Sequence, residues 1–128
     1  MDLIFKKLYE KADNAGRNAA YRSVPTPMIV GTAKNLFDTE LDYSKPVEVV
    51  NDGVCGFAWI NFSPGTSRLA KWLKKNKLAR KDDYYGGVTI WVSDYNQSMQ
   101  RKEAYANAFA KVFIDFGYER TYSMSRMD

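Results

Sequence analysis

The feature that most constrains the fold is an alternation of strand and helix patterns in the second half of the chain. Residues 54–62 and 88–93 are rich in β-branched and aromatic side chains, as strands are. Residues 67–77 and 97–116 carry apolar residues at helical spacing, and residues 120–125 alternate again. The order predicts a βαβαβ unit and an α+β (or α/β) fold with a small mixed sheet.

The two faces of the predicted sheet differ in side-chain size. If the three strands are parallel neighbours, right-handed crossovers place both helices on one face. Gly56 is small enough to lie beneath such helices. The opposite face then carries four candidate interface residues, which are Phe57, Trp59, Thr89 and Trp91. Because two tryptophans need a cover, we expect either the N-terminal helix or a second subunit to lie on this face.

The N-terminal half predicts one further helix and a hairpin. Residues 2–21 show a helical apolar stripe, which Pro25 and Pro27 end. Residues 28–30 suit a short edge strand, and residues 31–46 show no period and suit a loop. Residues 47–50 and 54–62 flank Asn-Asp-Gly, a hairpin signal. We therefore expect one domain, residues 1–128, with three helices.

Composition excludes several kinds of chemistry. The 128 residues contain no histidine and one cysteine, Cys55, so Ser-His-Asp catalysis, Cys-His catalysis and Cys/His zinc sites are ruled out. We interpret Cys55 as a small buried strand residue and expect no cofactor. Asp38, Glu40 and Asp42 alternate in the irregular stretch, where scattered acids are mostly surface charges, so we expect no metal site. No apolar run is long enough to span a membrane.

Positive charge is concentrated in one segment. Between residues 68 and 81 there are seven basic residues and no acidic one, whereas the remaining 12 basic and 15 acidic residues have a net charge of −3. The segment follows a strand and opens a helix, a geometry that offers free backbone N–H groups to an anion. The candidate anion-binding residues are Thr66, Ser67, Arg68, Lys71, Lys74, Lys75, Lys77, Arg80 and Lys81. The simpler alternatives are plain N-capping by Thr66 or Ser67 and a solvated helix face.

Four short motifs resemble a known group of sequences. They are Gly53–Trp59, Tyr85–Val92, Gln97–Tyr105 and Ser125–Asp128. Over roughly residues 20–128 the chain resembles small, uncharacterised proteins encoded by bacteriophages. The resemblance implies a protein made in the cytoplasm of an infected bacterial host, and it implies no particular activity.

Three functions remain open on these grounds. The leading hypothesis is a non-enzymatic phage accessory protein that binds an anionic target through residues 66–81. That target would be nucleic acid, a nucleotide, or a host nucleic-acid-handling defence complex, which a counter-defence inhibitor would engage. The alternative is a homo-oligomeric scaffold protein that associates through the Trp59/Trp91 face. The third is a small hydrolase that uses carboxylates and lysines. We expect an anionic partner, which would be nucleic acid, a nucleotide or an acidic protein surface, together with a homo-oligomer and no membrane partner.

Overall fold

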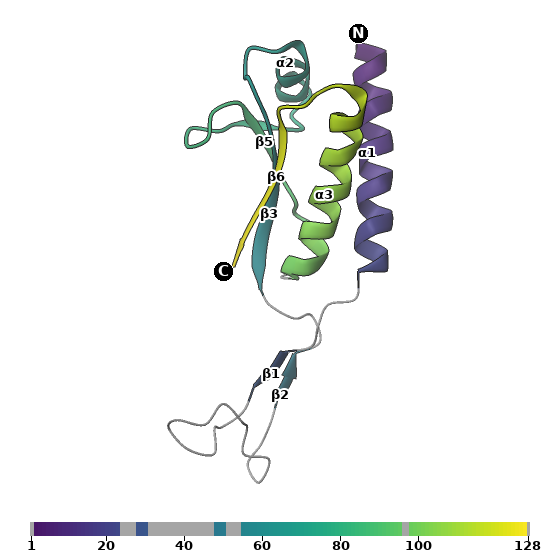
Figure 1. Ribbon diagram of the computed structural model, residues 1–128. Coiled ribbons are helices and arrows are strands. Elements are labelled where there is room, and N and C mark those ends of the chain that lie inside the picture. Colours follow the sequence, from purple (N-terminus) through teal and green to yellow (C-terminus); the bar gives the residue numbers. More distant parts are fainter. Residues whose placement is uncertain (1, 24–27, 31–47, 51–54, 96–97, 128) are drawn as a thin grey trace.

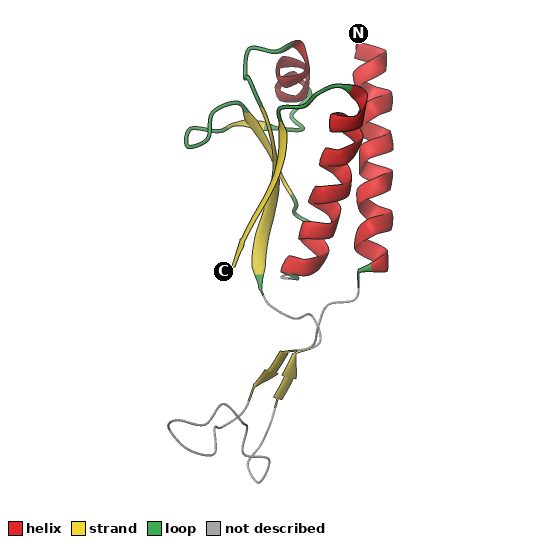
Figure 2. Ribbon diagram, in the orientation of Figure 1, coloured by secondary structure: helices red, strands yellow, loops and turns green. Residues whose placement is uncertain are grey.

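The computed structural model describes residues 2–23, 28–30, 48–50, 55–95 and 98–127, and it has the predicted α+β class (Figures 1 and 2). Three helices are present in these ranges, α1 (Asp2–Arg22), α2 (Arg68–Lys75) and α3 (Met99–Phe116). Four strands form one sheet in the order β4 (Arg80–Lys81), β5 (Val88–Trp91), β3 (Gly56–Phe62) and β6 (Thr121–Met127).

The three long strands of this sheet are not parallel neighbours. β3 lies between β5 and β6 and pairs antiparallel with both, so β5 and β6 run in the same direction without touching. The pairing of Phe62 with Val88 shows that β5 begins beside the end of β3. The eight-residue helix α2 lies near this end of the sheet and does not return the chain along its length (Figure 1). Of these two helices, α3 makes such a return, from β5 to β6.

The predicted hairpin between residues 47–50 and 54–62 is wrong. β1 (Met28–Val30) and β2 (Glu48–Val50) pair antiparallel with each other in a separate two-stranded sheet. The Asn-Asp-Gly turn and the expected loop at residues 31–46 lie outside the described residues. Both β1 and β2 were expected as strands, so the error concerns their partners. β-strand pairing depends on which segments meet in space, and a local turn signal does not determine that.

The helices form two layers on one face of the four-stranded sheet. α3 packs against β3 and β6, and α1 packs along the far side of α3 (Figure 1). Between α3 and the sheet, the ring of Phe62 meets the rings of Phe109 and Phe113 at centroid distances of 6.4 and 5.1 Å. All three rings are buried. Aromatic pairs at these separations contribute to stability beyond the area they bury.

Close packing of α1 on α3 depends on Gly16. An added Cβ there would lie 2.6 Å from the ring of Tyr105, whose hydroxyl donates a hydrogen bond to Asp13 on α1.

α3 ends where Gly117 adopts a φ of +116°, a left-handed cap. The buried apolar stripe of α3 ends before Phe116, which is exposed, although the helical spacing of residues 97–116 predicts that it continues to this residue. None of the described helices combines the length and the apolar character that spanning a bilayer demands.

Candidate functional site

The sheet face turned away from α1 and α3 carries the predicted aromatic residues. Trp59 at the centre of β3 pairs with Trp91 on β5 and with Met124 on β6, so these three side chains share one face. Thr89 and Phe57 belong to the same face, because each lies two residues from Trp91 or Trp59 along its strand. The structure therefore brings together all four residues that the sequence assigned to a candidate interface.

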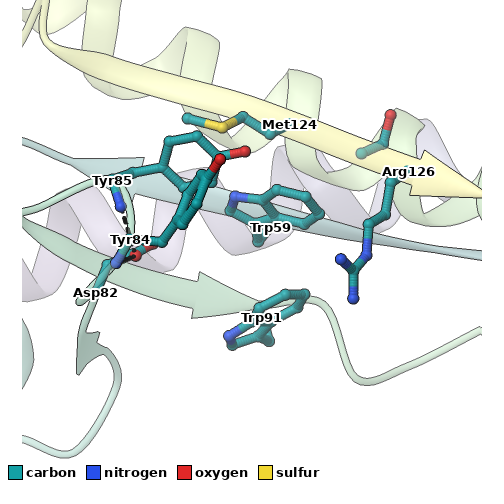
Figure 3. Close-up of a pocket in the computed structure, with 8 residues that line it drawn as sticks. Trp59, Asp82, Tyr84, Tyr85, Trp91, Met124 and Arg126 are labelled. Atoms are coloured by element: carbon teal, nitrogen blue, oxygen red, sulfur yellow. Dashed lines mark hydrogen bonds between the residues drawn. The ribbon is translucent and has the colours of Figure 1, made fainter.

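Trp59, Trp91 and Met124 line a groove of about 720 Å³, together with Tyr84, Tyr85 and Arg126 (Figure 3). Trp59 lies at its centre, 4.9 Å from the ring of Trp91 and 6.3 Å from the ring of Tyr85. Tyr84 stands edge-on against Tyr85 at 4.6 Å, and Figure 3 shows both tyrosines at the opposite end from Arg126. A groove of this size is in the range that holds small organic ligands.

A tightly bonded loop, residues 82–87, positions the two tyrosines. One carboxylate oxygen of Asp82 accepts hydrogen bonds from the backbone N–H groups of Tyr84 and Tyr85, both at 2.9 Å. The other accepts from the Thr89 hydroxyl at 2.7 Å. The Thr89 hydrogen bond, followed by those from the backbone, holds the pKa of the Asp82 carboxyl below its ordinary value of 3.8. The carboxylate thus stabilises its own loop by accepting these hydrogen bonds.

The same loop is tied to the centre of the sheet. The Asn61 side-chain amide donates to the carbonyl of Gly86 at 2.8 Å and to the Thr89 hydroxyl at 3.1 Å. Gly86 and Gly87 both have positive φ, +78° and +66°, as expected for a tight turn before a strand. The turn directs the loop over the sheet, so that Tyr85 lies against Trp59.

The expectation that the N-terminal helix covers the two tryptophans is wrong, and a second subunit as their cover stays a prediction. Trp59 is 6% exposed, and Tyr85 and Trp91 from the same chain lie against it. Trp91 remains 51% exposed, and α1 lies on the other side of α3 (Figure 1). The groove therefore offers the rings of Trp91, Tyr85 and Tyr84 to a ligand, with Trp59 as a fixed support.

Two arginines lie on the edge strands of this open face, and of the two Arg126 lines the groove. Arg80 on β4 pairs with Thr89, and Arg126 on β6 pairs with Phe57, so both project from the open face. The guanidinium carbon of Arg126 lies 5.6 Å from the centroid of the Phe57 ring, and the Lys102 ammonium lies at the same distance. In the described chain neither arginine forms a salt bridge, whereas the nearby Asp83 lies 3.8 Å from Lys81.

The predicted anion-binding segment is divided between three places. Arg68, Lys71, Lys74 and Lys75 lie on α2, Lys77 follows the helix with a φ of +59°, and Arg80 and Lys81 form β4. Only Arg80 joins the aromatic face. Thr66 is exposed before α2, and Ser67 is its N-cap, with its Oγ accepting from the Ala70 N–H at 3.1 Å. The simpler interpretation of Ser67, N-capping, is therefore correct.

Two further expectations concern reactive groups. Cys55 is exposed, not buried, because it precedes β3 at a level of the sheet that β5 does not reach. Within the described residues no three His, Cys, Asp or Glu side chains are placed to hold a metal ion, and Asp38, Glu40 and Asp42 lie outside those residues.

No protein-family model, curated protein or solved structure gives a significant match to the chain.

Sequence reasoning missed most of the groove wall. It did not place Tyr84 and Tyr85 against the strand tryptophans. It gave Asp82 no role, whereas the carboxylate organises the loop. The available signal was Asp82, which lies three residues before Tyr85 in a segment that ends with Gly86-Gly87. Aspartate commonly accepts hydrogen bonds from the next backbone N–H groups in a turn.

Proposed function

We propose that this protein is a non-enzymatic binder of single-stranded nucleic acid and that the strand lies across the open sheet face. The observation that carries the proposal is the set of partly exposed rings of Trp91, Tyr85 and Tyr84 in a groove that Arg126 also lines, with Arg80 on the opposite edge strand of the same face. The rings would stack with bases, and the guanidinium groups would contact phosphates.

Stacking favours an unpaired strand over a duplex. Every base offers a π-face, but in a duplex both faces are already covered by neighbouring bases. Four-stranded antiparallel sheets with helices on one face and aromatic residues on the other are a recurring platform for unpaired RNA bases. The groove of about 720 Å³ at this face has room for such planar groups.

The charges around the groove favour a phosphodiester chain over a neutral ligand of similar shape. Asp82 turns its carboxylate oxygens toward its own loop, and Asp83 lies near Lys81, so both acids are already engaged. Arg80 and Arg126 are exposed and carry a fork of N–H donors that matches phosphate oxygens. The net charge of +4 attracts a polyanion at long range.

The test is fluorescence polarisation with a labelled single strand of about ten nucleotides, a length within the range that such platforms cover. Replacing Trp91 with alanine should weaken binding by about 1–3 kcal/mol, the usual contribution of one stacked base. The matched control is Tyr21→Ala, because Tyr21 is an aromatic residue on α1 that is 89% exposed and remote from the sheet. This control should bind as the parent does.

Two results would overturn the proposal. One is no binding of the parent even at low salt, where phosphate contacts are strongest. The other is equal affinity for the single strand and for the duplex of the same sequence. Trp91→Ala is suited to the comparison because Trp91 is half-exposed and Trp59 stays in place, so a general loss of folding is not expected.

A homo-oligomeric scaffold is the second candidate, and the exposed apolar area around Trp91 and Met124 favours it. In that case, static light scattering over a wide concentration range would show a dimer or larger oligomer that Trp91→Ala dissociates. A monomer at high micromolar concentration would exclude this candidate and leave the face free for a strand.

We extend the proposal to the cell on the basis of the resemblance to phage-encoded proteins. There the protein would act in the cytoplasm of an infected bacterium, on nucleic acid or on a host defence complex that handles it. Recovery of the protein from infected cells together with its bound strand, followed by sequencing of that strand, would test this extension. Recovery with neither nucleic acid nor a host complex that handles it would contradict the extension.

A further inference from the structure

A second concave surface lies at the junction of α1 and α2, where α2 contacts the first turns of α1. Two hollows of about 280 and 350 Å³ meet there. Both are lined by Asp2, Trp72 and Lys75, so they form one groove around the Trp72 side chain. The Trp72 ring is held 5.8 Å from the ring of Phe5, which is buried. The groove therefore has a fixed, partly apolar floor.

The charges that line this groove are almost all positive. Lys6 from α1 and Arg68, Lys71 and Lys75 from α2 are all exposed, and Asp2 is the single carboxylate among the lining residues. None of these four cations takes part in a salt bridge within the described part of the chain. The groove thus has a formal net charge of about +3 at neutral pH.

The cations on α2 lie in a row. Arg68, Lys71 and Lys75 follow the spacing i, i+3, i+7, which keeps them on one stripe of the helix over about 10 Å. Like charges at these spacings repel one another, and α2 carries no acidic residue to offset the repulsion. An elongated anion along the stripe would relieve it, and a compact single charge would reach only part of the row.

We propose that the groove between α1 and α2 binds a chain of successive phosphate groups, independently of the aromatic sheet face. The Arg68 guanidinium would contact one phosphate through paired N–H donors, and Lys71 and Lys75 would act as point charges for the next ones. The Trp72 ring lines the floor beneath them. The phosphate chain belongs either to a nucleic-acid backbone or to a free polyphosphate.

The test compares two ligands that lack bases, an abasic single-stranded oligonucleotide and sodium tripolyphosphate, by isothermal titration calorimetry at several salt concentrations. The groove variant is Lys71→Gln/Lys75→Gln. The matched control is Lys74→Gln/Lys77→Gln, which removes the same charge from the same segment at two lysines that do not line the groove. Thermal unfolding should be nearly unchanged in both, because exposed charges contribute little to stability.

We expect the parent to bind at least one of the two ligands at low salt. The groove variant should lose about tenfold in affinity, and for the abasic strand the slope of log K against log salt should fall by about 1.4. The control should change affinity by less than about twofold. Binding of the abasic strand alone assigns the phosphate chain to a nucleic-acid backbone, and binding of tripolyphosphate alone assigns it to a polyphosphate.

Three results would overturn this inference. They are no binding of either ligand, equal losses in the groove variant and the control, and binding only to anionic lipid vesicles. Trp91→Ala separates this site from the sheet face, because that variant should keep full affinity for tripolyphosphate. If the abasic ligands bind and base-containing strands bind no better, the groove is retained and the stacking proposal fails.

Discussion

Replacing Gly87 with alanine should destabilise the protein far more than the same change at its neighbour Gly86. Both residues have positive φ, so each alanine variant bears the left-handed backbone cost of about 1–2 kcal/mol. At Gly86 an added Cβ would meet no atom within 4 Å. At Gly87 it would lie 2.1 Å from the carbonyl oxygen of Phe62 and 3.0 Å from its carbonyl carbon. What distinguishes the two positions is therefore the steric clash between the added Cβ at Gly87 and the backbone of Phe62.

The collision at Gly87 involves backbone on both sides, so no side chain can rotate away. Relief requires the start of β5 to move off the end of β3, where Val88 pairs with Phe62. Overpacking of this kind costs about 1–3 kcal/mol. We therefore expect losses of about 1–2 kcal/mol for Gly86→Ala and about 2–5 kcal/mol for Gly87→Ala. Domains of this size have about 5–15 kcal/mol of stability in total, so the second loss is severe.

Urea denaturation followed by tryptophan fluorescence measures both losses in one assay. Gly87→Ala should also weaken oligonucleotide binding, since movement of β5 displaces Trp91 relative to Trp59. Gly86→Ala should bind almost as the parent does, because the Gly86 carbonyl that accepts from Asn61 is kept. Losses in stability that agree within about 0.5 kcal/mol would refute the reasoning, since alanine would then fit equally well at both positions.

Two further expectations concern the core and the loop. Phe109→Ala or Phe113→Ala should each lower the free energy of unfolding by about 3–5 kcal/mol, and losses below about 1 kcal/mol at both would mean that the rings do not form the core. Asp82, whose pKa is lowered in the folded state, should contribute stability above the carboxyl's unfolded pKa of about 4 and lose it as the pH falls through the folded value. The free energies of unfolding of the parent and of Asp82→Asn, measured from neutral to acidic pH, should differ less below about pH 4. A difference in free energy that stays constant with pH would disprove this.

Apart from the two-residue strand β4, the sequence by itself determined the described elements and much of what each one buries. The helical spacing of Phe109 and Phe113 placed both in the core, and strand alternation put Trp59 and Phe57 on one face and Ala58 on the other. Such patterns are local, because backbone geometry fixes which neighbours share a face. The N-cap of α2 and the glycine that ends α3 could be predicted from the sequence for the same reason, because a helix cap depends on residues close together in the chain.

Only the tertiary structure decided which elements meet. The pairing of β2 with β1, the central place of β3 between β5 and β6, and the contact of Tyr85 with Trp59 all join segments far apart in the chain. The Asn61 amide reaches Gly86 across 25 residues, and no periodicity encodes that contact. The basic run was divided because α2 lies near the end of the sheet whereas β4 lies at its edge. Such placements follow from burying the largest apolar area at once, which is a property of the whole chain rather than of any segment.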